Sequence, residues 1–158
     1  MKEAILHELL KRAKEEIKLL EASRDASRSL ATDQEFKAES KYDTRALEAS
    51  YLASAESKRV EELKLEIQIL EEVDLDASRR LGEVAIGALV DLKYHEQIRS
   101  YFLIPTAGGT LLSVEGKPVL VVSVFSPIGD ALLGLKAGDE FEVETPKESR
   151  NYKIISFQ

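Results

Sequence analysis

Cysteine is absent from this sequence of 158 residues, and histidine occurs only as His7 and His95. Without thiols the chain can form no disulfide framework, no thiolate nucleophile and no cysteine zinc site, and two histidines do not suggest a multi-histidine metal centre. Long apolar runs are absent too: the longest nearly apolar stretch, residues 119–125, is far shorter than the roughly 18 residues of a spanning helix. We therefore expect no metal held by the protein alone and no membrane contact.

Glycine and proline are missing from the first half of the chain. All 8 glycines lie from Gly82 onward, and all 4 prolines lie from Pro105 onward. This change in composition predicts a domain boundary, with one domain over residues 1–76 and another over residues 81–158. Acidic residues stand where the apolar core of a signal peptide would lie, so we expect no secretory signal and a cytoplasmic protein.

Positive charge is in deficit, with 22 basic against 29 acidic side chains and a net charge of -7. A protein that grips nucleic acid directly neutralises many phosphates with lysine and arginine, and this balance argues against such binding. If the chain works near nucleic acid, another macromolecule is expected to hold that nucleic acid.

The first domain has the composition and periodicity of helices. It is rich in Ala, Glu, Lys, Leu and Arg, and its apolar residues recur at spacings of three and four. One seam contains Leu6, Leu10, Ala13, Ile17 and Leu20, and the other contains Val60, Leu63, Ile67 and Leu70. Two arms with heptad-like seams are typical of a coiled coil.

Folding the first domain back on itself tests the register. With Leu20 opposite Val60, every further pair toward Leu10 and Leu70 is apolar, and Arg24 falls opposite Glu56. This pattern favours an antiparallel hairpin with its tip near residues 36–44. The alternative is one uninterrupted helix that pairs with a second copy of the chain.

The second domain shows the pattern of strands. Segments rich in Val, Ile, Phe and Tyr are separated mostly by Gly or Pro, over residues 84–92, 100–104, 110–114, 119–124, 140–144 and 152–157. Between the fourth and fifth segments, Ala131-Leu132-Leu133 suits one or two helical turns before Gly134. The sequence therefore predicts an α+β protein, in which the hairpin precedes a small twisted antiparallel sheet with one short helix.

The string SPIGDALLGLKAGDEFEVETPKESRNYKI, residues 126–154, resembles the C-terminal signature of the bacterial Gre transcript-cleavage factors. In that family an SP-(I/L)-G-x-ALLG loop precedes a G-D strand entry and a final hairpin that begins with TP. The matching positions are Ser126, Pro127, Gly129, Ala131, Leu132, Leu133, Gly134, Gly138, Asp139, Thr145, Pro146 and Tyr152. The predicted hairpin followed by a sheet domain is also similar to the family's architecture, in which the sheet is FKBP-like.

The resemblance implies an accessory transcription elongation factor whose partner is RNA polymerase. The globular domain would dock at the polymerase's secondary channel, and the hairpin would enter that channel to act on paused or backtracked complexes. The docking residues implied are Ser126, Pro127, Ile128, Gly129, Leu132 and Leu133. Since Leu132 and Leu133 cannot both face inward on so short a helix, we expect at least one to meet the partner.

The resemblance further implies chemistry at the hairpin tip. Cleaving members carry two acids in a D-x-x-E motif, which help to hold a magnesium ion of the polymerase, so the factor itself needs no cofactor of its own. Here the tip reads FKAESKYDTRALE and contains no D-x-x-E; Thr44 and Leu47 occupy the two acidic positions. The remaining candidates are Asp43 and Glu39, because Mg²⁺ takes oxygen ligands and often only one or two carboxylates.

Each tip candidate also has a purely structural interpretation. Asp43 could cap the second arm, since an Asp ahead of a helix accepts an N–H bond from its first turn. Glu39 could simply be solvated. Phe36 and Tyr42 could close the end of the coil, or they could protrude toward the polymerase or its nucleotide.

Two rival functions follow from these observations. Loss of D-x-x-E favours a non-cleaving factor that occupies the channel and regulates transcription by occlusion. A further alternative is a peptidyl-prolyl isomerase or chaperone, since the expected sheet resembles FKBP domains. It is remote, because an FKBP-like fold alone does not imply that activity. We expect no enzyme, at most a stimulator of the polymerase's own cleavage, and a monomer that meets nucleic acid only indirectly.

Overall fold

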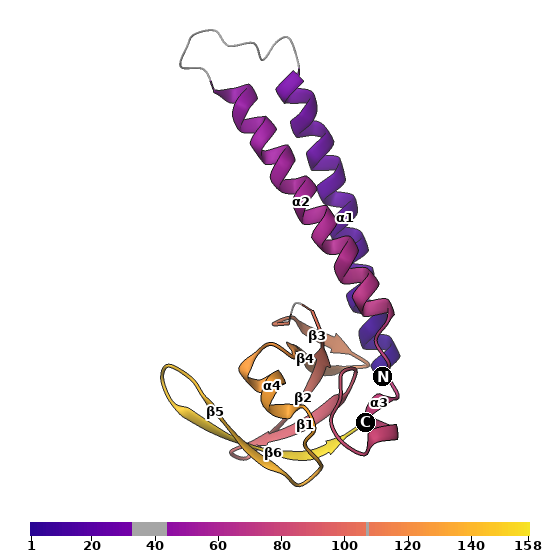
Figure 1. The fold of residues 1–158 in the computed structure, drawn as a ribbon, viewed down its shortest axis with the longest axis vertical. Coiled ribbons are helices and arrows are strands. Elements are labelled where there is room, and N and C mark those ends of the chain that lie inside the picture. The colour runs from indigo at the N-terminus through magenta and orange to yellow at the C-terminus, as the bar shows by residue number, and fades with distance from the viewer. Residues whose placement is uncertain (33–43, 107) are drawn as a thin grey trace. The chain divides into compact units, whose positions relative to one another are not determined.

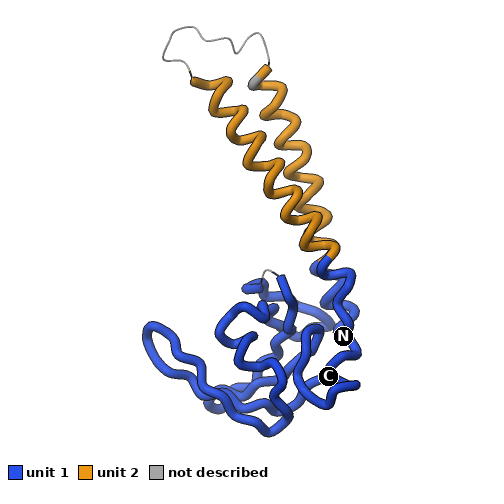
Figure 2. The backbone as a smooth tube through the Cα atoms, viewed as in Figure 1, with its two compact units in different colours: residues 1–9, 69–158 blue, residues 10–68 orange. Residues whose placement is uncertain are grey.

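The computed structural model describes residues 1–32, 44–106 and 108–158. The chain divides into two compact units, shown in different colours in Figure 2. The first unit contains Met1–Leu9 and Ile69–Gln158, and the second contains Leu10–Gln68. Among the described residues, no helix has both the length and the apolar character that crossing a membrane requires.

The helices α1 (Lys2–Thr32) and α2 (Arg45–Glu71) form an antiparallel hairpin, and the second unit contains the larger part of both (Figure 1). Side-chain hydrogen bonds join the helices: Ser27 Oγ donates to Glu56 Oε1 at 3.2 Å, Arg28 Nη2 to Ser57 Oγ at 3.4 Å, and Arg59 Nε to Glu16 Oε1 at 3.1 Å. The predicted hairpin is therefore confirmed. The alternative of one uninterrupted helix is wrong, because both arms pair within one chain.

The predicted seam between the two helices is confirmed in its middle and is wrong near the start of α1. Ala13, Val60 and Leu63 are buried as expected. Near the start of α1, however, Ile5 and Leu9 are buried, while Leu6 and Leu10 are only half-buried. Residues 1–9 belong to the first unit, so the packing of that unit selects their buried face and the hairpin seam does not.

The expected pair of Arg24 with Glu56 is also wrong. Glu56 accepts its hydrogen bond from Ser27, and Arg24 pairs with its neighbour Asp25. A serine is short enough to sit beside a buried carboxylate, whereas a guanidinium is costly to desolvate, and the half-buried Arg24 pairs instead with the exposed Asp25.

The first unit is built on one six-stranded sheet. Its strands are β1 (Leu89–Tyr94), β2 (Gln97–Ile104), β3 (Leu111–Val114), β4 (Lys117–Ser123), β5 (Glu140–Glu144) and β6 (Ser149–Phe157). The spatial order is β3-β4-β2-β1-β6-β5. All neighbouring pairs are antiparallel except β2 with β4, which is parallel.

The sheet is therefore mixed, and the expectation of a wholly antiparallel sheet is wrong. After β2 the chain first forms the edge strand β3, and β4 then turns back to lie between β3 and β2. This order makes β4 run in the same direction as β2. Alternation of apolar and polar residues reports which face of a strand is buried, but it carries no information on strand direction.

Two short helices complete the first unit. α4 (Pro127–Leu132) is the expected helix, and α3 (Ala77–Leu81) was not predicted. The first predicted strand also begins later, because residues 84–88 form an irregular connection before β1. The principal core includes Val90 and Leu92 of β1, Leu103 of β2, Ile154 of β6 and Leu132 of α4.

Candidate functional site

The α4 segment is held by its own N-terminal cap. Ser126 has an extended backbone, and its hydroxyl oxygen accepts a hydrogen bond from the Gly129 amide at 3.1 Å. The same hydroxyl donates to the Ser123 carbonyl at 2.7 Å. Pro127 occupies the first turn, where its missing N–H is not needed. Ser126 and Pro127, two of the predicted docking residues, therefore also stabilise the start of α4.

Gly129 is required by close backbone packing. A Cβ atom at this position would lie 1.9 Å from the Ser123 carbonyl oxygen, which is fixed in the sheet domain's backbone. No side chain larger than hydrogen fits there without moving α4 away from the end of β4. Gly129 therefore positions the segment and is itself buried.

Leu132 and Leu133 have opposite environments, as the sequence predicts. Leu132 is 0% exposed and belongs to the core, whereas Leu133 is 40% exposed. The burial of Leu132 anchors α4 on the sheet. Its neighbour is left available for contact with another molecule.

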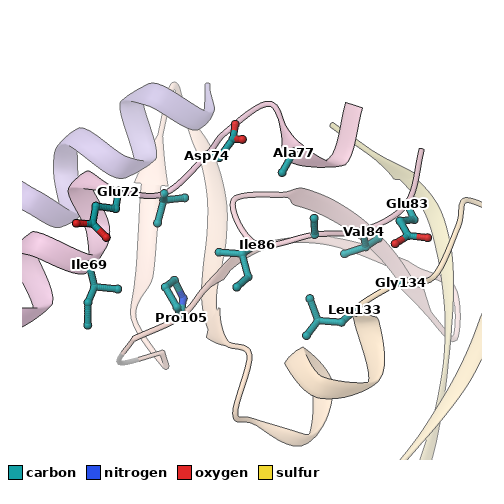
Figure 3. Close-up of a pocket in the computed structure, with 12 residues that line it drawn as sticks. Ile69, Glu72, Asp74, Ala77, Glu83, Val84, Ile86, Pro105, Leu133 and Gly134 are labelled. Atoms are coloured by element: carbon teal, nitrogen blue, oxygen red, sulfur yellow. The ribbon is translucent and has the colours of Figure 1, made fainter. Parts of the chain in front are cut away.

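Leu133 lies in a groove of about 590 Å³, which we call the Leu133 groove (Figure 3). The apolar lining residues are Ile69, Val73, Ala77, Val84, Ala85, Ile86, Pro105 and Leu133. They come from the end of α2, from the connection through α3 and from the loops after β2 and α4. The groove therefore joins four separate stretches of the first unit.

Backbone hydrogen bonds hold two of these stretches together. The Val84 amide donates to the Leu135 carbonyl at 2.8 Å, and the Gly134 amide donates to the Val84 carbonyl at 2.9 Å. Ser78 of α3 is buried, and its hydroxyl accepts from the Ala85 amide at 2.9 Å. Leu133 is consequently fixed beside the connection that precedes β1.

The charged residues that line the Leu133 groove are all acidic: Glu72, Asp74 and Glu83. The pKa of Asp74 is lowered, mainly by a hydrogen bond from the Arg80 side chain and further by one from the Asp76 amide. Asp74 is therefore ionised at neutral pH. An apolar floor with an acidic rim suits a partner surface that offers apolar and basic side chains.

The start of α4 borders a second groove, which we call the Pro127 groove. It has a volume of about 510 Å³ and includes Ser126, Pro127 and Ile128. Val143 and Pro146, from β5 and the turn after it, line it as well. The six predicted docking residues thus divide by role: Gly129 and Leu132 are scaffold, Leu133 faces one groove, and the other three border the second.

The predicted tip residues Phe36, Glu39, Tyr42 and Asp43 lie outside the described residues, so their roles stay predictions. Just beyond them, the Thr44 hydroxyl donates to Glu48 Oε1 at 3.0 Å. Among the described residues, no cluster of three His, Asp or Glu side chains is placed to hold a metal ion.

Sequence reasoning did not find the groove residues outside the signature. Ile69, Val73, Ile86 and Pro105 reach the Leu133 groove from distant parts of the chain. The available signal was Val84-Ala85-Ile86-Gly87, an apolar run ahead of β1 that reads as strand. Its interruption at Gly87, which has a φ of 88°, is the one feature that could have indicated an irregular connection.

A helical hairpin followed by a mixed sheet with the capped α4 segment defines the class of this protein. The family model described as "Transcription elongation factor, GreA/GreB, C-term" matches residues 78–158. This match covers half of the chain, and the chain belongs to the GreA/GreB family of transcription elongation factors.

Two curated relatives give the degree of similarity. The chain is 35% identical over 102 residues to transcription elongation factor GreA of Streptococcus sanguinis (strain SK36), covering 63% of this chain and 59% of the relative. It is 34% identical, over the same shares, to GreA of Streptococcus pneumoniae serotype 2 (strain D39 / NCTC 7466). The matched part thus spans less than two thirds of these relatives' length.

Solved structures of related factors are more distant. GreA factor homolog 1 (Gfh1) of Thermus thermophilus is 17% identical, with 97% of this chain and 94% of that chain covered and a TM-score of 0.37. GreA/GreB from Nitrosomonas europaea is 23% identical, with 55% and 64% covered and a TM-score of 0.36.

Proposed function

We propose that this chain binds RNA polymerase through the α4 segment and acts through its hairpin in the secondary channel, on paused or backtracked complexes. Membership of the GreA/GreB family supports the partner. The observation that carries the docking assignment is the contrast between two adjacent leucines, one 0% and the other 40% exposed. A half-exposed leucine in an apolar groove is suited to be a contact anchor.

The charge of the chain fits this role. With a net charge of -7, the protein meets nucleic acid mainly through the polymerase, which holds the DNA and RNA itself. The acidic rim of the Leu133 groove favours a polymerase surface with basic side chains beside an apolar one. The factor works as a cytoplasmic monomer, and the hairpin that forms within one chain supports the monomer.

The docking assignment is tested by replacing Leu133 with glutamate and measuring affinity for core polymerase. We expect at least a tenfold loss, because a charged side chain would be buried without a partner in the apolar floor, and tenfold corresponds to about 1.4 kcal/mol. Leu111→Glu is the matched control, since Leu111 is 65% exposed on β3 and lies in neither groove. Its affinity should stay within about twofold of wild type.

A second substitution, Pro127→Glu, probes the other groove and should also weaken binding. The docking assignment is wrong if both variants bind polymerase as wild type does while their circular dichroism shows an intact fold.

A non-cleaving channel regulator is the second candidate function, and the tip sequence favours it. Thr44 and Leu47 stand at the family's two acidic positions, and Glu48 already accepts a bond from Thr44, the residue just before its helix. A magnesium ion held at about 2.1 Å tolerates little misplacement of a carboxylate. We therefore expect weak or absent stimulation of cleavage.

The two candidates separate in one assay on stalled, backtracked elongation complexes with 3′-labelled RNA. Cleavage by wild type that is lost first in Asp43→Ala and then in Glu39→Ala supports a cleavage factor that uses the polymerase's own magnesium. No released fragments, with polymerase affinity intact, support occlusion. Strong cleavage that survives both substitutions contradicts the assignment of the tip acids.

A further inference from the structure

The sheet domain contains a third cleft, which belongs to neither groove. Its volume is about 470 Å³, within the range of roughly 300–1,000 Å³ that is usual for small-molecule sites. Its aromatic and basic lining residues are Tyr94, His95, Arg99, Tyr101, Arg150 and Tyr152, and we call this site the tyrosine–arginine cleft. The acidic Glu96 lines it as well and is paired with Lys93 at 3.6 Å.

Strand register brings these residues together from three strands. On β1 and β2, Leu92 pairs with Arg99 and Val90 pairs with Tyr101. On the other side of β1, Leu92 pairs with Ile154 of β6, two residues beyond Tyr152. Because alternate residues of a strand share a face, the tyrosines and arginines lie on the face that includes Leu92.

The aromatic rings form a connected cluster. The centroids of Tyr94 and Tyr152 are 5.2 Å apart, and those of Tyr152 and Phe141 are 5.4 Å apart in a stacked arrangement. The His95 ring lies 4.2 Å from Tyr94. Tyr152 is buried, whereas Tyr94 is only half-buried and His95 is exposed. The cluster thus presents an accessible aromatic surface on a rigid base.

Positive charge lies beside this surface. The Arg99 guanidinium is exposed and donates to the Gln97 side chain at 3.0 Å, and it has no carboxylate partner among the described residues. Arg150 lies 5.6 Å from the centroid of the Tyr94 ring and is paired with Glu148 at 2.8 Å. In a strongly acidic protein, Arg99 is therefore a cation available to an anion.

Tyr101 supplies an independent sign of a ligand. The residue is 5% exposed, and its hydroxyl has no hydrogen-bond partner among the described residues. Tyr101 belongs to the core and also lines the cleft. Burial raises the pKa of Tyr101, which keeps the hydroxyl a neutral donor at physiological pH.

We propose that the tyrosine–arginine cleft binds a nucleotide, with the base against the Tyr94 and His95 rings and the phosphate on Arg99, where the Tyr101 hydroxyl donates a further bond. Aromatic rings beside arginine are the combination that stacks bases and holds phosphates in proteins. The nucleotide can be free or can end an RNA strand. One phosphate contact is compatible with the acidic chain, whereas a long nucleic-acid track is not.

This inference does not rest on polymerase docking, because none of the six residues lines the Leu133 groove or the Pro127 groove. Its failure and the failure of docking are therefore distinguishable. The test titrates the isotope-labelled full chain with the four ribonucleoside 5′-monophosphates, followed by NMR. We expect saturable shifts of Tyr94, Arg99, Tyr101 and Tyr152 with at least one of them.

Two further arms identify the source and the chemistry of the ligand. A four-nucleotide RNA that binds at the same residues more tightly than the mononucleotide indicates an RNA end, and one that binds no more tightly indicates a free nucleotide. Inorganic phosphate and the unphosphorylated nucleosides should each bind at least tenfold more weakly. If phosphate alone binds as well as the nucleotide, the site recognises only an anion and the proposal is wrong.

Substitutions in the cleft test which side chains bind the nucleotide. Arg99→Gln should weaken nucleotide binding about tenfold, and Arg99→Lys should restore part of it, since lysine keeps the charge but loses the planar fork. Tyr101→Phe removes only the hydroxyl and should weaken binding severalfold. Lys136→Gln removes an equal charge from an exposed loop outside the cleft and should have no effect. Absence of shifts at millimolar nucleotide, or shifts unchanged in both Arg99→Gln and Tyr101→Phe, overturns the assignment.

Discussion

The two units of the molecule bury different kinds of residue. The first unit has a core of aliphatic and aromatic side chains around Val90, Leu103 and Leu132. The second unit has a thin seam in which Ser27, Ala53 and Glu56 are buried together with Val60 and Leu63. A packed core tolerates few changes of volume, whereas a narrow seam of small and polar residues leaves most of its surface free to change.

This difference bears on where the family is recognisable. The family model matches residues 78–158, all within the first unit. There, close backbone contacts such as that of Gly129 restrict what each position can hold. The tip of the hairpin instead departs from the family's acidic motif. The chain thus keeps the family's sequence pattern in the first unit and loses the acidic motif in the hairpin.

The largest expected effect on stability comes from disturbing the close packing of the first unit. Gly129→Ala places a methyl group against the Ser123 carbonyl oxygen and should lower the free energy of unfolding by about 3 kcal/mol, at the upper end of the usual cost of overpacking. Gly138→Ala is the control. It has a φ of 92° but open space around it, so only backbone strain of about 1–2 kcal/mol is expected. Urea unfolding measures both, and equal losses would contradict the packing argument.

A smaller effect is expected in the seam of the second unit. Glu56 is 6% exposed, and its Oε2 atom has no partner, while Oε1 accepts from Ser27. Ser27→Ala alone should destabilise the hairpin by about 1–3 kcal/mol, because it leaves the buried carboxylate without its bond. Ser27→Ala with Glu56→Leu should then recover at least this loss, since it replaces the polar pair by apolar side chains.

The measurement for this pair is chemical unfolding followed by helical circular dichroism. A double variant less stable than Ser27→Ala would show that the buried pair stabilises the hairpin, and the contrast between the two units would then be weaker than we describe.

The smallest effect concerns pH and the first unit. Burial raises the pKa of Tyr101 above its ordinary value of 10.0. The neutral phenol is therefore favoured in the folded state, and the associated stability is fully present below about pH 10 and is lost as the pH rises through the folded pKa. Tyr101→Phe lacks this dependence. The difference in unfolding free energy between wild type and variant should be constant from pH 7 to 9. Above pH 10 the wild type should lose stability relative to the variant.

Much of the architecture follows from local patterns. Helical spacing predicts both arms of the hairpin, β5 has the predicted bounds, and the Ser-Pro-x-Gly signature indicates the capped turn of α4. The opposite environments of Leu132 and Leu133 follow from the shortness of that helix. The shifted seam at Ile5 and Leu9 and the pairing of Glu56 with Ser27 could not be predicted, because each depends on which neighbours compete for one buried position.

The tyrosine–arginine cleft could not be predicted from the sequence either. The sequence suggests a domain poor in aromatics, with Tyr94, Tyr101, Phe141 and Tyr152 scattered over about a third of the chain. The sheet order β2-β1-β6-β5 gathers them on one face. No spacing in the sequence indicates this, because the pairing of β1 with β6, which joins the two hairpins, links strands that are far apart along the chain.

The sequence by itself determined the two arms of the hairpin, α4, most strands and the family signature, because these depend on residues close together in the chain. The tertiary structure decided the parallel pairing of β2 with β4, the residues that surround Leu133 and the site where two arginines meet three tyrosines. These features depend on strand order and on irregular backbone between elements. Their physical cause is the competition among distant segments for the same core, which local periodicity does not record.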